Sequence, residues 1–474
     1  MVQPLQVEKK QQDEDPKLAS YQQWVFLTTF LNYAYAHWTR KCYTNVKVQL
    51  MDAGISSLTL TAMDSGFMFT YAGGSFVTGM LGDRFSPTFI VGLGLLGSTL
   101  CLLLIILGAS TSLVSNVAIS GTFFLGVQLL HGLFQATGGP VNTAIMGNWF
   151  SKKGRGLIFG LWTCHQYVGD IVAALASAYI LSLDNVDWRM CIWVPAILNG
   201  IWSYINFFHL PSTPADAGII TVAQKEAEAK AKNSANTEED AHTVGFLEAF
   251  MLPNVMSYAI AFGFFKLVNY AMFFQLPVIL SSHFDSSMSN VISSLYSVGM
   301  MPGGVVCGWV SDLYGGRRAC VIATFMAILC PLLYVFAMYM DSMPIGLLLS
   351  LLCFMGCLVG GPNNIITSAV AADLADDPSI GQSKVLGTVT GIINGSGSVT
   401  AAIGQLAIPV LYDMGKQDNV GYRYVWFFLI ACTVVGTSLM GSKIRKELSE
   451  ESAAPLAASN QRGYQAVAVT ESKV

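Results

Sequence analysis

Two basic residues lie inside long apolar runs of this sequence and are the first candidates for chemistry. Between Ala249 and Phe284, Lys266 is the only Asp, Glu, Lys or Arg in 36 residues. Pro253 and Pro277 bracket the run and place Lys266 near the middle of the helix that it predicts. A lysine at the centre of a membrane-spanning helix costs about 2.5–3.5 kcal/mol, so such a residue normally faces a water-filled cavity or a partner. From mid-helix, the side chain has too far to reach for snorkelling. We therefore predict a binding role for Lys266.

Arg40 is the second cation, and it ends a run of 22 residues, 18–39, without a formal charge. An interfacial anchor would be ordinary at such a place. A motif in the first half of the sequence recurs 229 residues later in the second half. Counted with this offset, the position in the second half that is equivalent to Arg40 lies within one helical turn of Lys266. Arginine offers phosphate oxygens a planar fork and lysine a compact point charge. We predict that the two cations meet between the two halves and bind a phosphate group.

Four further polar residues are candidates for the same site. Lys41 follows Arg40, but neighbours on a helix point about 100° apart, so a role in the site and a role elsewhere both stay open. His37 and Tyr270 lie one turn from Arg40 and Lys266 and are candidate cavity-lining donors. His165 either packs against other helices or donates to phosphate, and an imidazole titrates near neutrality.

Two carboxylates, Asp64 and Asp170, also fall inside apolar runs, where an anion site would not favour them. They either pair with Arg40, Lys41 or His165 while the site is empty, or serve helix packing. The sequence leaves both interpretations open.

The elements that position these residues are long apolar helices. Of 474 residues, 53% are hydrophobic and 11% charged, and the mean hydropathy is +0.52. About 20 apolar residues span a bilayer, and the short alternating strands of a membrane β-barrel are not the pattern of this chain. We predict an all-α membrane protein with twelve transmembrane helices, at 23–45, 57–80, 88–110, 118–148, 156–182, 190–210, 249–282, 289–310, 319–340, 345–370, 385–412 and 423–443.

The distribution of basic residues predicts the orientation. With twelve spans, the termini and the even-numbered connections share one side, which then has eighteen Lys and Arg against five on the other. By the positive-inside bias, both termini are cytosolic. Residues 1–20 lack the pattern of a cleaved signal peptide.

An internal repeat divides the chain. "GMLGDR" at 79–84 follows the second predicted span and "GWVSDLYGGRR" at 308–318 follows the eighth. A polar segment rich in Ala, Glu and Lys separates the halves. Parallel repeats of six helices are typical of secondary transporters. The predicted domains are a tail at 1–20, a bundle at 21–210, a cytosolic linker at 211–247, a second bundle at 248–445 and a tail at 446–474.

The repeated segment resembles the signature of the major facilitator superfamily, which implies a gating role for its residues. The matching residues are Gly79, Asp83, Arg84, Gly308, Asp312, Arg317 and Arg318. The second copy is nearly complete, whereas the first has Ser86 and Pro87 where the pattern has a Gly and basic residues.

A narrower resemblance covers about residues 25–440. "HWTRK" at 37–41, "GNWFSKKGRGLIFGLWTCHQYVGD" at 147–170, "FFKLVNYAMFFQLP" at 264–277 and "GPNNIITSAVAADL" at 361–374 are similar to the organophosphate:phosphate antiporters, and most to the sugar phosphate exchangers of solute carrier family 37. The resemblance implies exchange of a phosphorylated sugar for inorganic phosphate, usually in the endoplasmic reticulum membrane. It places Arg40 and Lys266 at the phosphate-binding positions and a His at position 165. Asn394 stands where an acid is usual and Asn363 where an aromatic is expected, which leaves the sugar open.

Other classes of function are less well supported. We find no nucleotide loop, nucleophile elbow or His-Glu metal motif, and therefore predict neither an enzyme nor a cofactor nor a metal site. The expected partners are small organophosphates, inorganic phosphate and the lipid bilayer, without nucleic acid. The alternatives are a facilitator for other organic or inorganic anions, and a phosphate sensor that does not transport.

Overall fold

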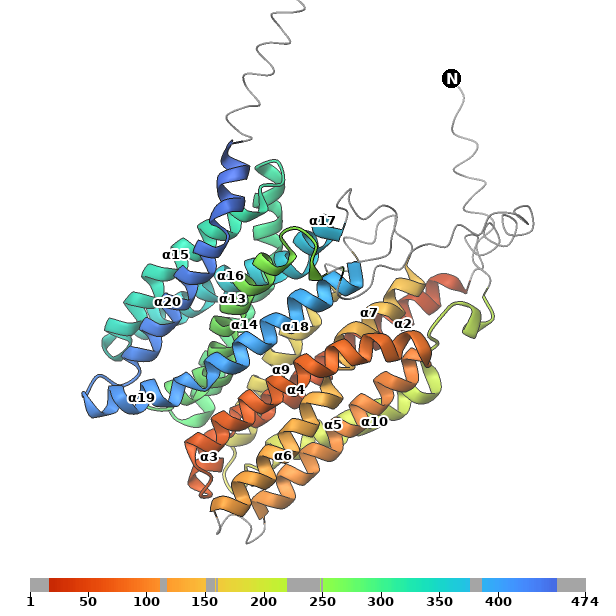
Figure 1. Cartoon of the computed structure of the whole chain (residues 1–474). Helices are drawn as coiled ribbons and strands as arrows, with labels where there is room; N and C mark the ends of the chain where they lie inside the picture. The colour runs from red at the N-terminus through yellow and green to blue at the C-terminus, as the bar shows by residue number, and fades with distance from the viewer. Residues whose placement is uncertain are drawn as a thin grey trace, which may run out of the picture.

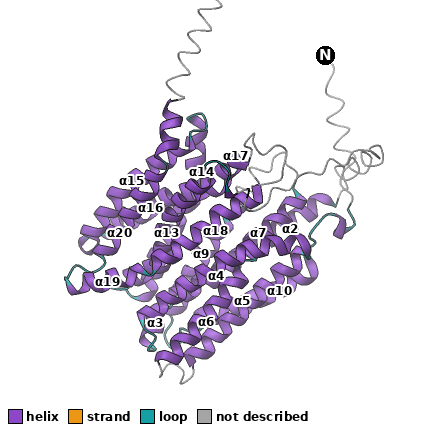
Figure 2. Ribbon diagram, in the orientation of Figure 1, coloured by secondary structure: helices purple, strands orange, loops and turns teal. Residues whose placement is uncertain are grey.

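The computed structural model describes residues 17–110, 117–150, 158, 161–219, 248, 250–375 and 386–449. Over these residues the regular structure is helical (Figure 2). The predicted all-α fold class is confirmed for these residues.

The helices before the central segment correspond to the first six predicted spans. They are α2 (Leu18–Asn45), α3 (Lys47–Asp52), α4 (Ser57–Arg84), α5 (Pro87–Ser110), α6 (Val117–Gln135), α7 (Gly138–Trp149), α9 (His165–Leu181) and α10 (Met190–His209), followed by the 3-10 turn η2 (Ala215–Ala217). The fourth predicted span is thus two helices, α6 and α7, and α3 is a short helix that the sequence did not predict.

The helices after the central segment correspond to the last six predicted spans. They are α13 (Val255–Leu280), α14 (Ser286–Leu313), α15 (Arg318–Tyr339), η3 (Met340–Ser342), α16 (Ile345–Ile365), the π-helical turn η4 (Ile366–Val370), α17 (Ala371–Ala375), α18 (Leu386–Gln405), α19 (Ala407–Gln417) and α20 (Arg423–Leu439). A helix at Gly441–Ser449 continues α20 after a bend of 48°.

Among the described helices, six are long and apolar enough to cross a membrane by length and composition alone, and the bent pair that begins with α20 makes a seventh. The six contain α5, α10, α13, α14, α15 and α16. The first and second predicted spans, α2 and α4, fall outside this set although both have 28 residues. Their polar side chains lower the mean hydropathy, and many of those side chains are buried inside the protein.

The two halves repeat the same helix pairing. In the N-terminal half α2 packs against α9, α4 against α6, and α5 against α10. In the C-terminal half α13 packs against α18, α14 against α16, and α15 against α20, which are the equivalent spans. The halves contact each other where α4 meets α18 and α9 meets α14 (Figure 1). The first described turn of α2 and the end of the Gly441–Ser449 helix lie at the same end of the molecule (Figure 1).

The two signature segments lie at equivalent helix ends. Gly79, Asp83 and Arg84 form the last turns of α4, and Gly308 and Asp312 those of α14, while the side chains of Asp83, Arg84 and Asp312 lie outside the described part. Gly315 and Gly316, with φ of 70° and 80°, make the turn into α15, a conformation that favours glycine.

At the start of α15, Arg317 is the N-cap residue and Arg318 donates to Asp373 of α17. The predicted domain limits stay predictions, because the tails and most of the linker lie outside the described residues.

Candidate anion-binding site between the two halves

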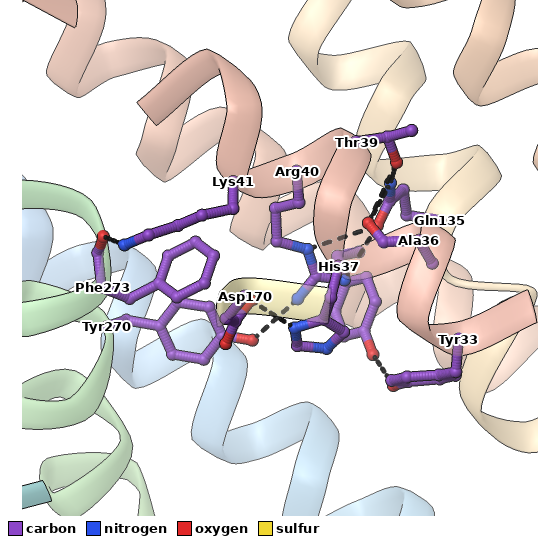
Figure 3. A network of polar contacts seen from close by, with 11 residues as sticks. Tyr33, Ala36, His37, Thr39, Arg40, Lys41, Gln135, Asp170, Tyr270 and Phe273 are labelled. Atoms are coloured by element: carbon purple, nitrogen blue, oxygen red, sulfur yellow. Dashed lines mark hydrogen bonds and ion pairs between the residues drawn. The ribbon is translucent and has the colours of Figure 1, made fainter. Parts of the chain in front are cut away.

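Arg40 is the centre of a hydrogen-bonded site on α2. Its side chain is buried, with 3% of the residue exposed. Nε and Nη2 donate to Gln135 Oε1 at 3.3 and 3.0 Å, and Nη1 donates to Tyr270 Oη at 3.1 Å (Figure 3). The guanidinium carbon lies 5.0 Å from the ring centroid of Phe67 and 4.9 Å from that of Tyr71. The ring faces of Phe67 and Tyr71 and the side-chain amide of Gln135 therefore fix the position of the guanidinium group.

Gln135, at the end of α6, is the residue that orients Arg40. Its amide nitrogen donates to Ala36 O at 2.9 Å and to Thr39 Oγ1 at 2.8 Å, which directs its oxygen toward the guanidinium (Figure 3). Sequence reasoning missed Gln135. The available signal was an uncharged amide within the apolar run of the fourth predicted span, directly before the break between α6 and α7.

Tyr270 joins the two predicted cations. It accepts from Arg40, and its ring centroid lies 5.7 Å from the ammonium of Lys266. Arg40 and Lys266 come from different halves of the chain, and Arg40 lies at the hydroxyl of this tyrosine while Lys266 lies near its ring. The structure thus brings the two predicted cations to one tyrosine, and their role in binding stays a prediction.

Lys266 is buried on α13 with 4% of the residue exposed. Its Nζ donates to Asn394 Oδ1 at 2.5 Å, to Asn394 O at 3.1 Å and to Ser398 Oγ at 2.7 Å, all on α18. Asn394 is the position where the family pattern has an acid. With asparagine there, the described hydrogen-bond partners of Lys266 are uncharged, so its positive charge is not neutralised by them.

Lys41 leaves α2 in a different direction from Arg40 (Figure 3). Its Nζ donates to the backbone oxygen of Phe273 at 2.5 Å and lies 4.2 Å from the centroid of the Phe273 ring. That oxygen is available because residue 277, four positions on, is a proline without an N–H. Lys41 therefore binds the C-terminal half at a backbone acceptor, away from the described partners of Arg40.

His37 and His165 are both buried and differ in their partners. Nδ1 of His37 lies 3.0 Å from Asp170 Oδ1. Neither ring nitrogen of His165 has a hydrogen-bond partner within the described part of the chain. The His165 ring packs 4.3 Å from the ring centroid of Tyr33 and 4.5 Å from that of Trp162. His165 thus has two unused polar atoms in an aromatic surround.

The two intramembrane carboxylates have partners that the sequence did not predict. Asp64 Oδ2 lies 2.5 Å from Nζ of Lys47, and Asp170 pairs with His37. The predicted pairs with Arg40, Lys41 or His165 are absent among the described residues. The physical reason is α3: it returns the chain after α2, so that Lys47, predicted in an outer loop, is 2% exposed and also donates to Phe274 O at 3.0 Å.

The arrangement is suited to binding a dianion. Two cations from different halves lie next to one phenol, and their described hydrogen-bond partners are neutral. The carboxylate of Asp170 pairs with His37 and acts on Arg40 only from a distance. A buried charge that is not fully compensated is unfavourable, and an anionic ligand lowers that penalty for both cations. Arg40 offers several N–H groups and Lys266 three, so phosphate oxygens can replace the present neutral acceptors.

The same fold occurs in solved membrane transporters. The chain is similar to a bacterial homologue of the human lysosomal transporter Spinster in an inward-facing, unoccupied conformation, with a TM-score of 0.66 and 13% identity, over 90% of this chain and 98% of that chain. It is similar to a D-xylose-proton symporter with a TM-score of 0.66 and 12% identity, over 88% and 96% of the two chains. At these identities the likeness shows the fold alone, which is that of a membrane transporter.

Sequence comparison shows the family. Residues 25–405 match the profile of the Major Facilitator Superfamily. The chain is 32% identical over 464 residues to Sugar phosphate exchanger 3 of Bos taurus, covering 87% of this chain and 91% of that protein. It is 30% identical over 488 residues to Glucose-6-phosphate exchanger SLC37A2 of Xenopus laevis, covering 90% and 93%. The chain therefore belongs to the Major Facilitator Superfamily and, within it, to the sugar phosphate exchanger family, solute carrier family 37.

Family membership confirms three predictions. The chain is an integral membrane protein that crosses the membrane several times, it is a transporter, and it is not an enzyme.

Proposed function

We propose that this protein exchanges a phosphorylated sugar for inorganic phosphate by alternating access, with the phosphate group bound between Arg40 and Lys266. The observation that carries the proposal is the meeting of these two buried cations at Tyr270, with neutral hydrogen-bond partners. The names of the relatives, a sugar phosphate exchanger and a glucose-6-phosphate exchanger, support the substrate class.

In the proposed site the bound phosphate accepts hydrogen bonds from donors in both halves of the chain. Arg40 binds two oxygens through its fork while Gln135 holds the guanidinium, and Lys266 binds a third oxygen in place of Asn394. Tyr270 and His37 lie where they can donate to the ligand, and His165 offers an unused ring N–H. Lys41 adds positive potential from its place against Phe273.

The charge of the two cations explains why the carrier would exchange its substrates instead of returning empty. In the empty carrier, bringing the halves together moves two cations into a poorly hydrated space. At an effective dielectric constant near 20, two unit charges a few ångström apart repel by about 4 kcal/mol, and each 1.4 kcal/mol is about tenfold in rate. A phosphate dianion reverses the sign of the interaction, so the loaded carrier crosses much faster than the empty one.

The units that rock are, in this proposal, the predicted bundles 21–210 and 248–445, with the signature segments at the ends of α4 and α14 as the gating elements. We further propose the endoplasmic reticulum as the membrane, with both termini cytosolic. The basic residues at the even-numbered connections support this orientation. A C-terminal tag that protease cannot reach in sealed vesicles with the cytosolic face outward would contradict it.

The test is uptake of labelled phosphate into proteoliposomes with and without internal phosphate. Wild-type protein should show strong stimulation by internal phosphate, and glucose 6-phosphate should compete with the labelled phosphate. Lys266→Gln should lose most of the exchange, and the remaining flux should depend less on internal phosphate because the empty return is less hindered.

The matched control is Lys443→Gln, which removes a lysine that lies 5.4 Å from the ring centroid of Tyr258, near the start of the Gly441–Ser449 helix. It should exchange as the wild type does. If Lys266→Gln exchanges phosphate at the wild-type rate and is fully stimulated by internal phosphate, Lys266 is not part of the binding site. If the wild type exchanges phosphate but no sugar phosphate competes, the protein is a facilitator for other anions. If the wild type shows no flux, the result favours a sensor.

A further inference from the structure

A second group of polar side chains crosses between the two halves; its two tyrosines are buried, its three amides are partly buried, and all are uncharged. Tyr167 Oη of α9 donates to Asn364 Oδ1 of α16 at 2.9 Å, and Gln166 Nε2 lies 3.3 Å from the same oxygen. Tyr296 lies on α14, which packs against α9, and its hydroxyl donates to Asn269 Oδ1 of α13 at 3.1 Å. We name these five residues the amide–phenol cluster.

The amide–phenol cluster adjoins the cation site through two shared helices. Asn269 lies three residues after Lys266 on α13, and residues three apart on a helix lie on the same face. On α9, Tyr167 lies three residues before Asp170, whose Oδ1 is 3.0 Å from Nδ1 of His37, one turn from Arg40. A ligand whose phosphate lies at Tyr270 can therefore direct its remaining atoms toward the cluster.

The packing of α14 against α16 holds two members of the cluster in place. A Cβ at Gly356 would lie 2.1 Å from Tyr296 O, and one at Gly360 would lie 2.7 Å from Met300 O. Glycine at these positions lets the two backbones approach closely, as small residues do between membrane helices. Asn364 lies one residue before the end of α16, where the π-helical turn η4 begins at Ile366. Such turns occur often at functional sites.

We propose that the amide–phenol cluster binds the hydroxyl groups of the sugar and determines which phosphorylated sugar the carrier accepts. This inference rests on the proposed function. A sugar hydroxyl both donates and accepts, so it can insert between Tyr167 and Asn364, accepting from the phenol and donating to the amide oxygen. A site that is built to hydrogen-bond a hydroxyl strongly rejects an analogue without it, because the buried groups of the site are then left unpaired.

The same contacts would have a different consequence if they only held the two halves together. Loss of the Tyr167 hydroxyl would then change the transport of every substrate by the same factor, since every substrate crosses through the same conformations. A sugar subsite instead separates substrates that share a phosphate and differ in hydroxyl groups.

The experiment measures inhibition of labelled phosphate exchange by unlabelled phosphate, glycerol 3-phosphate and glucose 6-phosphate in proteoliposomes. For Tyr167→Phe and Asn364→Leu, we expect the half-inhibitory concentration of glucose 6-phosphate to rise about fivefold to tenfold. The half-inhibitory concentration of phosphate should change less than twofold, and the change for glycerol 3-phosphate should lie between those for phosphate and glucose 6-phosphate. The control is Tyr43→Phe, a buried tyrosine whose hydroxyl donates to Leu60 O within the N-terminal half at 3.0 Å. It should leave all three values unchanged.

Equal shifts for all three compounds, or no shift for glucose 6-phosphate, would overturn the inference. If a variant is too slow to assay, stabilisation of the detergent-solubilised protein against heat by phosphate and by glucose 6-phosphate gives the same comparison. Failure of the proposed function is seen separately: wild-type protein would then exchange phosphate without competition by sugar phosphates, or would not exchange at all.

Discussion

Two regions of the protein interior contain buried cations, and the cations of the two regions differ in whether a carboxylate is their hydrogen-bond partner. At the end of α2 and in α3, Lys47 pairs with Asp64 at 2.5 Å. In the middle of the molecule, Arg40 and Lys266 are equally buried and their described hydrogen-bond partners are neutral. Burial alone thus does not identify a binding residue; the kind of hydrogen-bond partner does. The nearby carboxylate of Asp170 pairs with His37 and acts on Arg40 only from a distance.

The difference has a physical basis. Removal of one partner from a buried ion pair leaves an uncompensated charge, so the pair is a structural unit that favours one arrangement of its helices. A buried cation with neutral partners is stabilised further by an anion, so its free energy depends on the ligand. Lys47 also donates to Phe274 O and Lys41 to Phe273 O, which connects this first region to the C-terminal half near the Pro277 position.

The largest effect on stability is expected from Asp64→Asn. The variant keeps the shape of the side chain and leaves Lys47 buried without its counter-charge, which costs about 3–5 kcal/mol. We expect a large drop in the melting temperature of the purified protein, while the folded fraction keeps its phosphate affinity. An unchanged melting temperature would show that the Lys47–Asp64 pair is not a structural unit.

Arg40→Lys should separate function from stability in the other region. The charge stays but the two-pronged contact with phosphate is lost, which corresponds to about 1.5–3 kcal/mol, or about tenfold to a hundredfold in transport. The melting temperature without ligand should stay close to that of the wild type. Near-normal phosphate exchange by a well-expressed Arg40→Lys protein would reduce Arg40 to an interfacial anchor.

Removal of both members of the ion pair should be far milder than removal of one. In Lys47→Met/Asp64→Leu, apolar side chains of similar size fill the space and no buried charge remains, so stability should lie within about 1–2 kcal/mol of the wild type. Comparison of the melting temperatures of the single and double variants measures this. A double variant as unstable as Asp64→Asn would indicate that packing, rather than charge, explains the first result.

The smallest expected effect concerns Pro277, which frees the backbone oxygen that Lys41 uses. In Pro277→Ala the new N–H can donate to Phe273 O, so Lys41 loses part of its role. Lys41→Met should therefore destabilise the wild type by about 0.5–1.5 kcal/mol more than it destabilises Pro277→Ala. A double-mutant cycle of melting temperatures tests this, and additive effects would contradict the link between the proline and the lysine.

Much of the fold could be predicted from local sequence, because a membrane imposes a simple rule. Each span must be an apolar helix of about 20 residues that satisfies its own backbone hydrogen bonds. The apolar runs therefore predicted the helices, and the segments at 79–84 and 308–318 predicted the repeat that appears as matched helix pairing. The breaks at 136–137 and 406 and the short helix α3 were missed, because each is a local turn inside or beside a longer apolar run.

The sequence by itself determined that Lys266 is exceptional, because an isolated charge in an apolar run is costly wherever the helix packs. Arg40 became a candidate through the repeat offset of 229 residues, and Tyr270 through its place one turn from Lys266. Only the tertiary structure decided the partners. Gln135 orients Arg40 from 95 positions away, Lys41 reaches a carbonyl 232 positions away, and Lys47 lies buried against Asp64. Contacts between distant segments depend on how the helices pack and turn, and helix periodicity carries no record of them.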